Sequence, residues 1–310
     1  MVIRMSFTGS VKDEVTRLDG NKLEYMAELS CIVRNSANID DDIVITVETN
    51  SVARRIFKLI KSLYDVIPVI TVRRRYNFTQ NLSYILRISS KKKIILEDLS
   101  IVHNDSFLNI PMDYLINDEE CLRAYLRGLF VVVGSVNDPK TSRYHLEFIV
   151  NDYEYANYVS FLLNKFRLNS KVIKREKNYM VYIKEAEKIS DFLRIINAYQ
   201  AVLYFENIRI YRDHKNMTNR LNNCEQANVD KIFLTASRQL KDIEVLKNGD
   251  MLDLLDDKLR EVIYYREMYP ESSLQELADI MSHELGYSIT KSGLNHRFRK
   301  IRDIAQKINK

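Results

Sequence analysis

The chain has 310 residues, of which 46% are apolar and 29% charged, a balance typical of a soluble globular protein with room for two hydrophobic cores. No apolar run is long enough to cross a bilayer, and the N-terminus lacks a secretory signal, so we expect a cytoplasmic protein without membrane contact. Cys31, Cys121 and Cys224 lie too far apart for a zinc or disulfide pattern, and we expect neither a metal nor another cofactor.

Charge is distributed unevenly along the chain. Residues 223–310 carry 14 Lys and Arg against 15 Asp and Glu, yet residues 288–310 hold seven basic side chains and one acid, Asp303. A local basic surface on a balanced domain favours a polyanionic partner, although a solvated helix face has the same composition.

An internal repeat occupies the first two thirds of the chain. A helical pattern at Tyr25–Leu29 returns 100 residues later at Tyr125–Leu129, and each is followed by a turn and a β-rich stretch. A second amphipathic helix follows in both copies, with apolar residues at a spacing of three and four. The sequence therefore predicts an α+β domain over residues 1–215, in which an αββαββα unit occurs twice, over about 21–110 and 120–210.

Both copies place a basic strand after that second helix. Equivalent positions of this kind suit contacts with DNA phosphates. The candidate backbone contacts are Arg73, Arg74 and Arg75 in the first copy and Lys171, Lys174, Arg175 and Lys177 in the second.

The repeat resembles the fold of LAGLIDADG homing endonucleases. In the second copy, Leu126-Arg127-Gly128-Leu129 and Gly134 match the motif, but the metal-binding acid is replaced by Val133, and by Val33 in the first copy. A magnesium site needs carboxylate oxygens, so the resemblance implies a retained fold and a lost nuclease activity. A pair of packed helices without DNA contact remains the alternative.

The last third of the chain predicts an all-α domain over residues 223–310, after a polar linker at 216–222. One helix is expected from about Cys224 to Leu246, and another ends at Tyr269 before Pro270. Ser273 and Glu276 then have the spacing of a capping box, and Gly286 marks the end of that helix.

The final helix, expected from near Ser292, has an apolar stripe on one side and basic side chains on the other. Together with the helix before it, over about 273–307, it predicts a DNA-reading helix-turn-helix, because Arg, Lys and Asn are the side-chain types that read base edges. An ordinary solvated helix is the alternative. The stripe comprises Leu294, Phe298, Ile301, Ala305 and Ile308, and the candidate DNA-binding residues are Lys291, Ser292, Asn295, His296, Arg297, Arg299 and Lys300.

Four stretches distributed along the chain resemble the WhiA family. They are residues 6–14 (SFTGSVKDE), 126–139 with 144–147, 223–228 (NCEQAN) and 291–301 (KSGLNHRFRKI). The resemblance implies a sequence-specific DNA-binding transcriptional regulator linked to sporulation septation, or to cell division and chromosome segregation, without nuclease activity.

The expected partner is double-stranded DNA, which implies association with the nucleoid, and we expect a monomer. Two other functions stay open at this point. One is an active homing endonuclease, and the other is an adaptor that binds RNA polymerase or another regulator.

Overall fold

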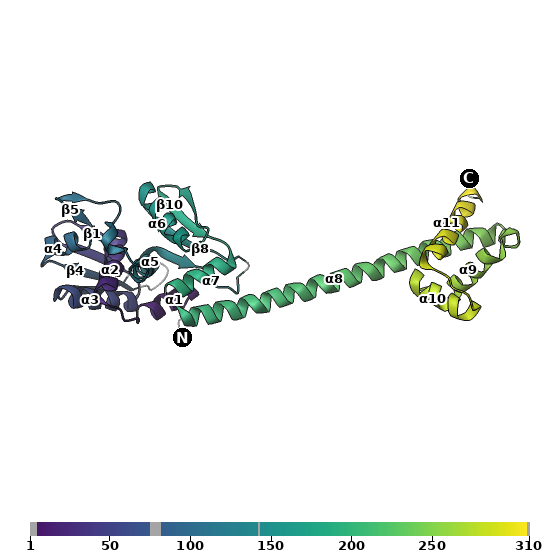
Figure 1. The fold of residues 1–310 in the computed structure, drawn as a ribbon, viewed down its shortest axis with the longest axis horizontal. Coiled ribbons are helices and arrows are strands. Elements are labelled where there is room, and N and C mark those ends of the chain that lie inside the picture. The colour runs from purple at the N-terminus through teal and green to yellow at the C-terminus, as the bar shows by residue number, and fades with distance from the viewer. Residues whose placement is uncertain (1–4, 75–81, 142, 309–310) are drawn as a thin grey trace. The chain divides into compact units, whose positions relative to one another are not determined.

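A computed structural model of the chain describes residues 5–74, 82–141 and 143–308 (Figure 1). They form two compact units that divide between Arg212 and Asp213, within helix α8 (Tyr199–Asn248). Each unit has its own hydrophobic core, and each is described by itself.

The first unit contains the αββαββα unit twice, which confirms the predicted duplication and fold class. The first copy comprises α2 (Lys22–Ser36), β1 (Ala37–Ile39), β2 (Ile43–Val47), α3 (Asn50–Tyr64), β3 (Val69–Arg74), β4 (Leu82–Ile88) and α4 (Lys92–Asp98). The second comprises α5 (Glu119–Val133), β7 (Gly134–Val136), β8 (Leu146–Val150), α6 (Tyr153–Lys165), β9 (Lys171–Arg175), β10 (Asn178–Ile183) and α7 (Ala186–Ile195). Before and between the copies lie α1 (Phe7–Val15), β5 (Val102–His103), β6 (Ser106–Phe107) and the 3-10 helix η1 (Asp113–Leu115).

Each copy builds one four-stranded antiparallel sheet, with the order β1-β2-β4-β3 in the first and β7-β8-β10-β9 in the second. Alternate residues of β2 and β8 are buried, so one face of each sheet covers the core and the other face is open. The basic strands β3 and β9 occupy the same edge in the two sheets, as the repeat predicts.

Helices α2 and α5 lie side by side between the two sheets (Figure 1). Their close approach requires a residue without a side chain, because a Cβ on Gly128 would lie only 2.5 Å from the carbonyl oxygen of Glu28. Both helices begin at a side-chain cap: Asn21 accepts from the Glu24 amide, and Asp118 accepts from the Cys121 amide. The first helices of the two copies therefore meet in the middle of the unit.

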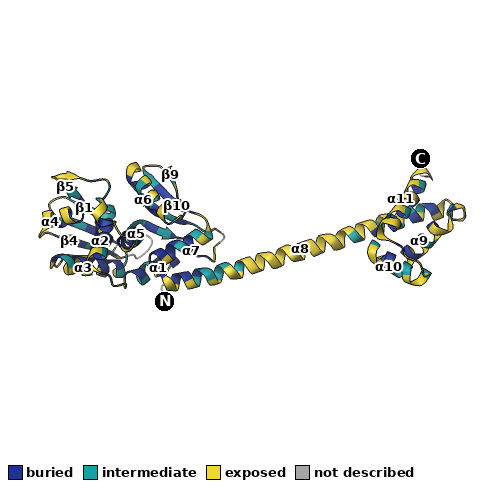
Figure 2. Cartoon of the chain, in the orientation of Figure 1, coloured by how far each residue is buried: buried dark blue, intermediate teal, exposed yellow. Residues whose placement is uncertain are grey.

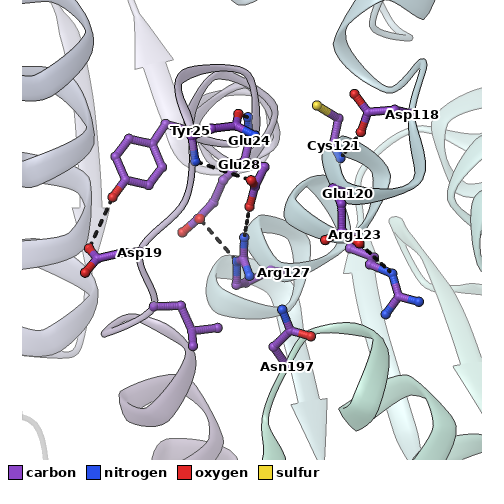
Figure 3. A network of polar contacts seen from close by, with 12 residues as sticks. Asp19, Glu24, Tyr25, Glu28, Asp118, Glu120, Cys121, Arg123, Arg127 and Asn197 are labelled. Atoms are coloured by element: carbon purple, nitrogen blue, oxygen red, sulfur yellow. Dashed lines mark hydrogen bonds and ion pairs between the residues drawn. The ribbon is translucent and has the colours of Figure 1, made fainter.

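A buried ion network ties these helices together (Figure 3). The carboxylate of Glu28 accepts two hydrogen bonds from Arg55 of α3, at 2.8 and 2.6 Å, and both side chains are fully buried. Arg127 reaches across from α5, with its Nε 3.3 Å from the same carboxylate and its Nη2 3.8 Å from Glu24. One carboxylate thus holds α2, α3 and α5.

Burial lowers the pKa of Arg55, but the hydrogen bonds and negative charge of Glu28 outweigh it and leave the pKa above its ordinary value. The Arg55 guanidinium therefore stays charged, and it depends on Glu28 for its counter-charge.

In the part that the structure describes, the second unit consists of helices alone. Besides the end of α8 it contains the 3-10 helix η2 (Leu252–Leu254), α9 (Asp257–Met268), α10 (Leu274–Leu285) and α11 (Lys291–Ile308). The apolar faces of these helices form its core, which includes Ile243, Leu246, Val262, Leu277, Met281, Leu294 and Ile301.

The expected linker at 216–222 lies inside α8, so the expectation of a helix beginning near Cys224 is wrong. The polar composition was misleading because no glycine or proline interrupts residues 199–248, and a backbone without such breakers can stay helical while solvated on all sides. The start of α8 is also held by Glu14, whose carboxylate accepts from the amides of Gln200 and Ala201 at 2.7 and 3.0 Å. The domain limits at 215 and 223 stay predictions.

Replacing Glu28 by alanine should destabilise the first unit by about 3–5 kcal/mol, because the buried Arg55 loses its counter-charge and the buried Arg127 keeps only Glu24, 3.8 Å away. The matched control is Glu119→Ala, which removes a 63% exposed carboxylate that pairs with Arg123 on α5. That change should cost less than about 1 kcal/mol. Urea unfolding followed by circular dichroism compares the two variants, and equal midpoints would contradict a structural role for the network.

Candidate nucleic-acid interface

Helices α10 and α11 form a helix-turn-helix. The Oγ of Ser273 accepts from the Glu276 amide at 3.2 Å, and the Glu276 carboxylate accepts from the Ser273 amide at 2.7 Å, which confirms the predicted capping box. Gly286 ends α10 with a φ of 75°, a conformation that glycine adopts without strain. The turn covers residues 286–290, and Thr290 accepts from the Gly293 amide, so α11 begins at Lys291.

The apolar stripe of α11 packs into the core as predicted, except at its end. Leu294, Phe298, Ile301 and Ala305 are buried, whereas Ile308 is 37% exposed in the last turn. Buried and exposed residues alternate along the helix (Figure 2). The stripe therefore fixes which side of α11 faces outward.

Five of the seven candidate side chains lie on that outer side. Lys291, Ser292, His296, Arg299 and Lys300 are exposed, and Asn295 is half-buried beside them. The charged members of this group form no ion pair with an acid among the described residues. The outer side of α11 thus combines basic charge with hydrogen-bond donors that are free to meet a partner.

Arg297 is placed differently from the other candidate residues. Its side chain is only 19% exposed and points toward α9, where its Nη1 lies 3.9 Å from Glu261. The reason is helical geometry: three residues after Leu294 correspond to a rotation that leaves Arg297 about 60° from that core residue. Glu261 also accepts a hydrogen bond from Tyr287 at 2.8 Å, so Arg297 belongs to a contact between helices rather than to the outer surface.

The basic residues of β3 divide between the two faces of their sheet. Arg73 pairs with Ser83 and Arg74 with Leu82, and side chains of paired residues share a face. Leu82 lies on the same side of β4 as the buried Leu86, four residues further along the strand. Strand alternation puts Arg73 and Arg74 on opposite sides of β3, with Arg73 on the side of the open face. Both residues are exposed on this edge strand, and Arg75 lies outside the described residues.

Strand β9 shows the same division. Lys171 and Arg175 pair with Tyr182 and Asn178 on the open face. Lys174 pairs with Tyr179, on the face of the buried Val181, and Lys177 lies exposed in the turn that follows. The charge of Arg175 is partly neutralised by Glu147 on the same open face, whose carboxylate lies 3.9 Å from its Nη1.

The ends of α2 and α5, where the resemblance to homing endonucleases places the metal-binding acids, line a cavity of about 470 Å³. Val33 is buried there and Val133 packs against the core. Asp152 also lines the cavity, but its carboxylate accepts from the Tyr155 amide at 2.8 Å as the cap of α6. The guanidinium of Arg34 also lies at this end, where it donates hydrogen bonds to the carbonyl oxygens of Ser100 and Leu108.

Across residues 5–74, 82–141 and 143–308, no group of three or more His, Cys, Asp or Glu side chains is arranged to hold a metal ion. No helix in these ranges is both long and apolar enough to span a membrane.

Sequence reasoning missed the residues that anchor the start of α8. The hydroxyl of Thr8 donates to the carbonyl oxygen of Val136 and accepts from its amide, at 2.8 and 2.9 Å. Glu14 caps α8, and Tyr204 of α8 donates to Asp138 at 3.3 Å. Residues 6–14 and 126–139 both belong to the stretches that resemble the family. Each of these hydrogen bonds joins residues more than 60 positions apart in the sequence, and no local sequence pattern reveals such a pair.

Comparisons with known proteins agree with this geometry. Three family models match the chain: the WhiA N-terminal LAGLIDADG-like domain at residues 24–102, the WhiA LAGLIDADG-like domain at 122–215 and the WhiA C-terminal HTH domain at 218–305. A probable cell division protein WhiA from Bacillus cereus (strain AH187) is 44% identical over 98% of this chain and 97% of its own length. The chain belongs to the WhiA family. A relative with the same description from Bacillus anthracis (strain CDC 684 / NRRL 3495) is equally similar.

Two solved structures of the family share the fold. Full-length DUF199/WhiA from Thermatoga maritima has a TM-score of 0.57 at 23% identity, covering 97% of this chain and 98% of that one. The N-terminal LAGLIDADG domain of DUF199/WhiA has a TM-score of 0.51, also at 23% identity, over 63% of this chain and 92% of that one. The match confirms the predicted combination of a LAGLIDADG-like region and a helix-turn-helix.

Proposed function

We propose that this WhiA-family chain is a sequence-specific, double-stranded-DNA-binding regulator of transcription that acts in cell division or sporulation septation. The observation that carries the proposal is the outer side of α11, where Ser292, His296, Arg299 and Lys300 are exposed opposite a stripe that is buried from Leu294 to Ala305. The name of the Bacillus relatives supports the link to division.

Helix α11 serves in this proposal as the recognition helix in the major groove. Arg299 and Lys300 are suited to the acceptor pair of guanine, and Asn295 to the donor and acceptor of adenine. The capping box of α10 and the turn at 286–290 hold α11 in one orientation, so these donors are presented with little loss of entropy on binding.

The first unit contributes phosphate contacts through the open faces of its two sheets. Arg73, Lys171 and Arg175 lie on those faces, at equivalent edges of the duplicated fold. Phosphate contacts position a protein on DNA without reading sequence, which leaves base recognition to the second unit.

We propose no nuclease activity, because Val33 and Val133 offer no oxygen to a cation at the place where the two central helices end. The active homing endonuclease is therefore the less favoured alternative. The monomeric state and an adaptor function toward RNA polymerase stay predictions from sequence.

The first test asks whether the protein cleaves DNA. Purified full-length protein with magnesium or manganese should leave a supercoiled plasmid library uncut, since the fold lacks the carboxylates that would activate water. Reproducible nicking or linearisation at one site, absent when the protein is heat-denatured, would overturn this part of the proposal.

The second test separates base reading from packing. Arg299→Ala should melt near the wild-type temperature, yet lose about 1–3 kcal/mol of preference for the specific site over unrelated DNA. Arg297→Ala is the matched control on the same helix, because its partner is Glu261 and its loss should leave that preference unchanged.

Leu294→Ala should instead destabilise the second unit by about 2–5 kcal/mol through a core cavity. Melting temperatures and the ratio of specific to nonspecific affinity measure both effects, and undiminished preference in Arg299→Ala would show that the outer side of α11 does not read bases.

The third test uses the two faces of β3. Arg73→Ala should weaken binding to all duplexes alike and reduce the slope of log affinity against log salt by about 0.9, the effect of one lost phosphate contact. Arg74→Ala, one residue away on the other face, should leave the slope near wild type. Fluorescence anisotropy titrations at several salt concentrations measure it. Equal slopes for wild type and Arg73→Ala would mean that the open face of the first sheet does not touch DNA.

A further inference from the structure

A second feature of the helical unit has no role in base reading. A cavity of about 410 Å³ lies where α8, α9, α10 and α11 come together. All residues that line it belong to the second unit. They are Asn228, Lys231, Ile232 and Thr235 of α8, Arg266 of α9, Ser272, Ser273 and Leu274 at the start of α10, and Lys291 of α11.

Arg266 is the unusual member of this group. The residue is 1% exposed, and its Nη1 donates to the carbonyl oxygens of Tyr269 and Ser272 at 3.2 and 2.7 Å. Its Nε has no hydrogen-bond partner, and no acid lies within ion-pair distance, in the part of the chain that the structure describes. The contrast with Arg55, which has Glu28 as its counter-charge, is clear.

Burial lowers the pKa of Arg266, and no neighbouring carboxylate acts to raise it. A buried guanidinium without an anion is costly, because its charge loses water without gaining a counter-charge. An anion bound in the cavity would give Arg266 its missing counter-charge.

Two lysines and two helix N-termini add to the same positive field. Lys231 and Lys291 are exposed at the cavity, and neither forms an ion pair with an acid among the described residues. Helix α10 starts here: its capping box occupies the amides of Ser273 and Glu276, which leaves the amide of Leu274 without an acceptor in the described structure. Amides at the start of a helix, together with its dipole, favour an anion.

We propose that this cavity binds a backbone phosphate of the DNA duplex, with Lys231 of α8, Arg266 and Lys291 as its cationic groups. The inference rests on the proposed function, since Lys291 starts the same helix that presents the next residue, Ser292, and Asn295, about one turn further on, to base edges. A phosphate at the N-terminus of α11 lies beside the bound groove, which favours a phosphodiester of the duplex over a free anion.

The proposal also assigns a role to α8. The stretch Asn223–Asn228 resembled its family without a visible function, and its last residue lines the cavity one helical turn before Lys231. Helix α8 then acts as a third helix at the DNA surface, beside α10 and α11.

The test uses full-length protein and the variant Lys231→Gln. Its matched control is Lys241→Gln, an exposed lysine of the same helix that does not line the cavity. Lys231→Gln should reduce the salt slope of duplex binding by about 0.9 and weaken specific and unrelated duplexes by the same factor, about three- to tenfold at 0.15 M salt. Lys241→Gln should match wild type, and Lys231→Arg should restore most of the slope.

Other outcomes separate the possible errors. If wild type binds its site and Arg299→Ala loses preference while Lys231→Gln keeps the full salt slope, the phosphate site is wrong and the proposed function stands. If wild type binds no duplex, both are wrong. If inorganic phosphate or ATP raises the melting temperature of wild type but not of Lys231→Gln, while duplex binding is equal in both, the cavity takes a free phosphate and the DNA assignment is overturned.

Discussion

Helices α2 and α5 can lie against each other only because Gly128 has no side chain, since a Cβ there would lie 2.5 Å from the carbonyl oxygen of Glu28. Much of the first unit follows from this contact. Strand β1 begins at Ala37, directly after α2, and β7 begins at Gly134, directly after α5. Where the helices cross thus decides where both sheets start, and therefore where the basic edges β3 and β9 lie relative to each other.

The two copies contribute different residues to the contact between α2 and α5. Glu28 and Gly128 are equivalent positions of the repeat, 100 residues apart. Gly128 of the second copy leaves room for the close approach of the helices. Glu28 of the first copy supplies the buried carboxylate that pairs with Arg55 and Arg127. A duplicated fold can in this way become dependent on both halves, because neither position tolerates the residue of the other: a glutamate at 128 would clash, and a glycine at 28 would leave two buried cations.

Apolar residues occupy the ends of the central helices, whereas basic residues lie on the sheets and in the second unit. The ends of the central helices carry Val33 and Val133, and Arg34 binds carbonyl oxygens where a metal would be repelled by its charge. The sheets keep exposed basic residues, and the second unit keeps a buried Arg266 without a counter-charge. Both features agree with the proposed function, in which the protein holds DNA phosphates without cleaving them.

Periodicity in the sequence was sufficient for the duplicated αββαββα unit, the capping box at Ser273 and the core stripe from Leu294 to Ala305, because these depend on neighbours within a few residues. The absence of an acid at positions 33 and 133 was equally readable. Tertiary structure alone decided the rest. The side chain of Arg297 lies toward Glu261 of another helix, and the polar residues 216–222 lie within α8. The first outcome depends on a partner distant in sequence and the second on a backbone free of glycine and proline, and a polar side chain carries no sign of which partner it will meet.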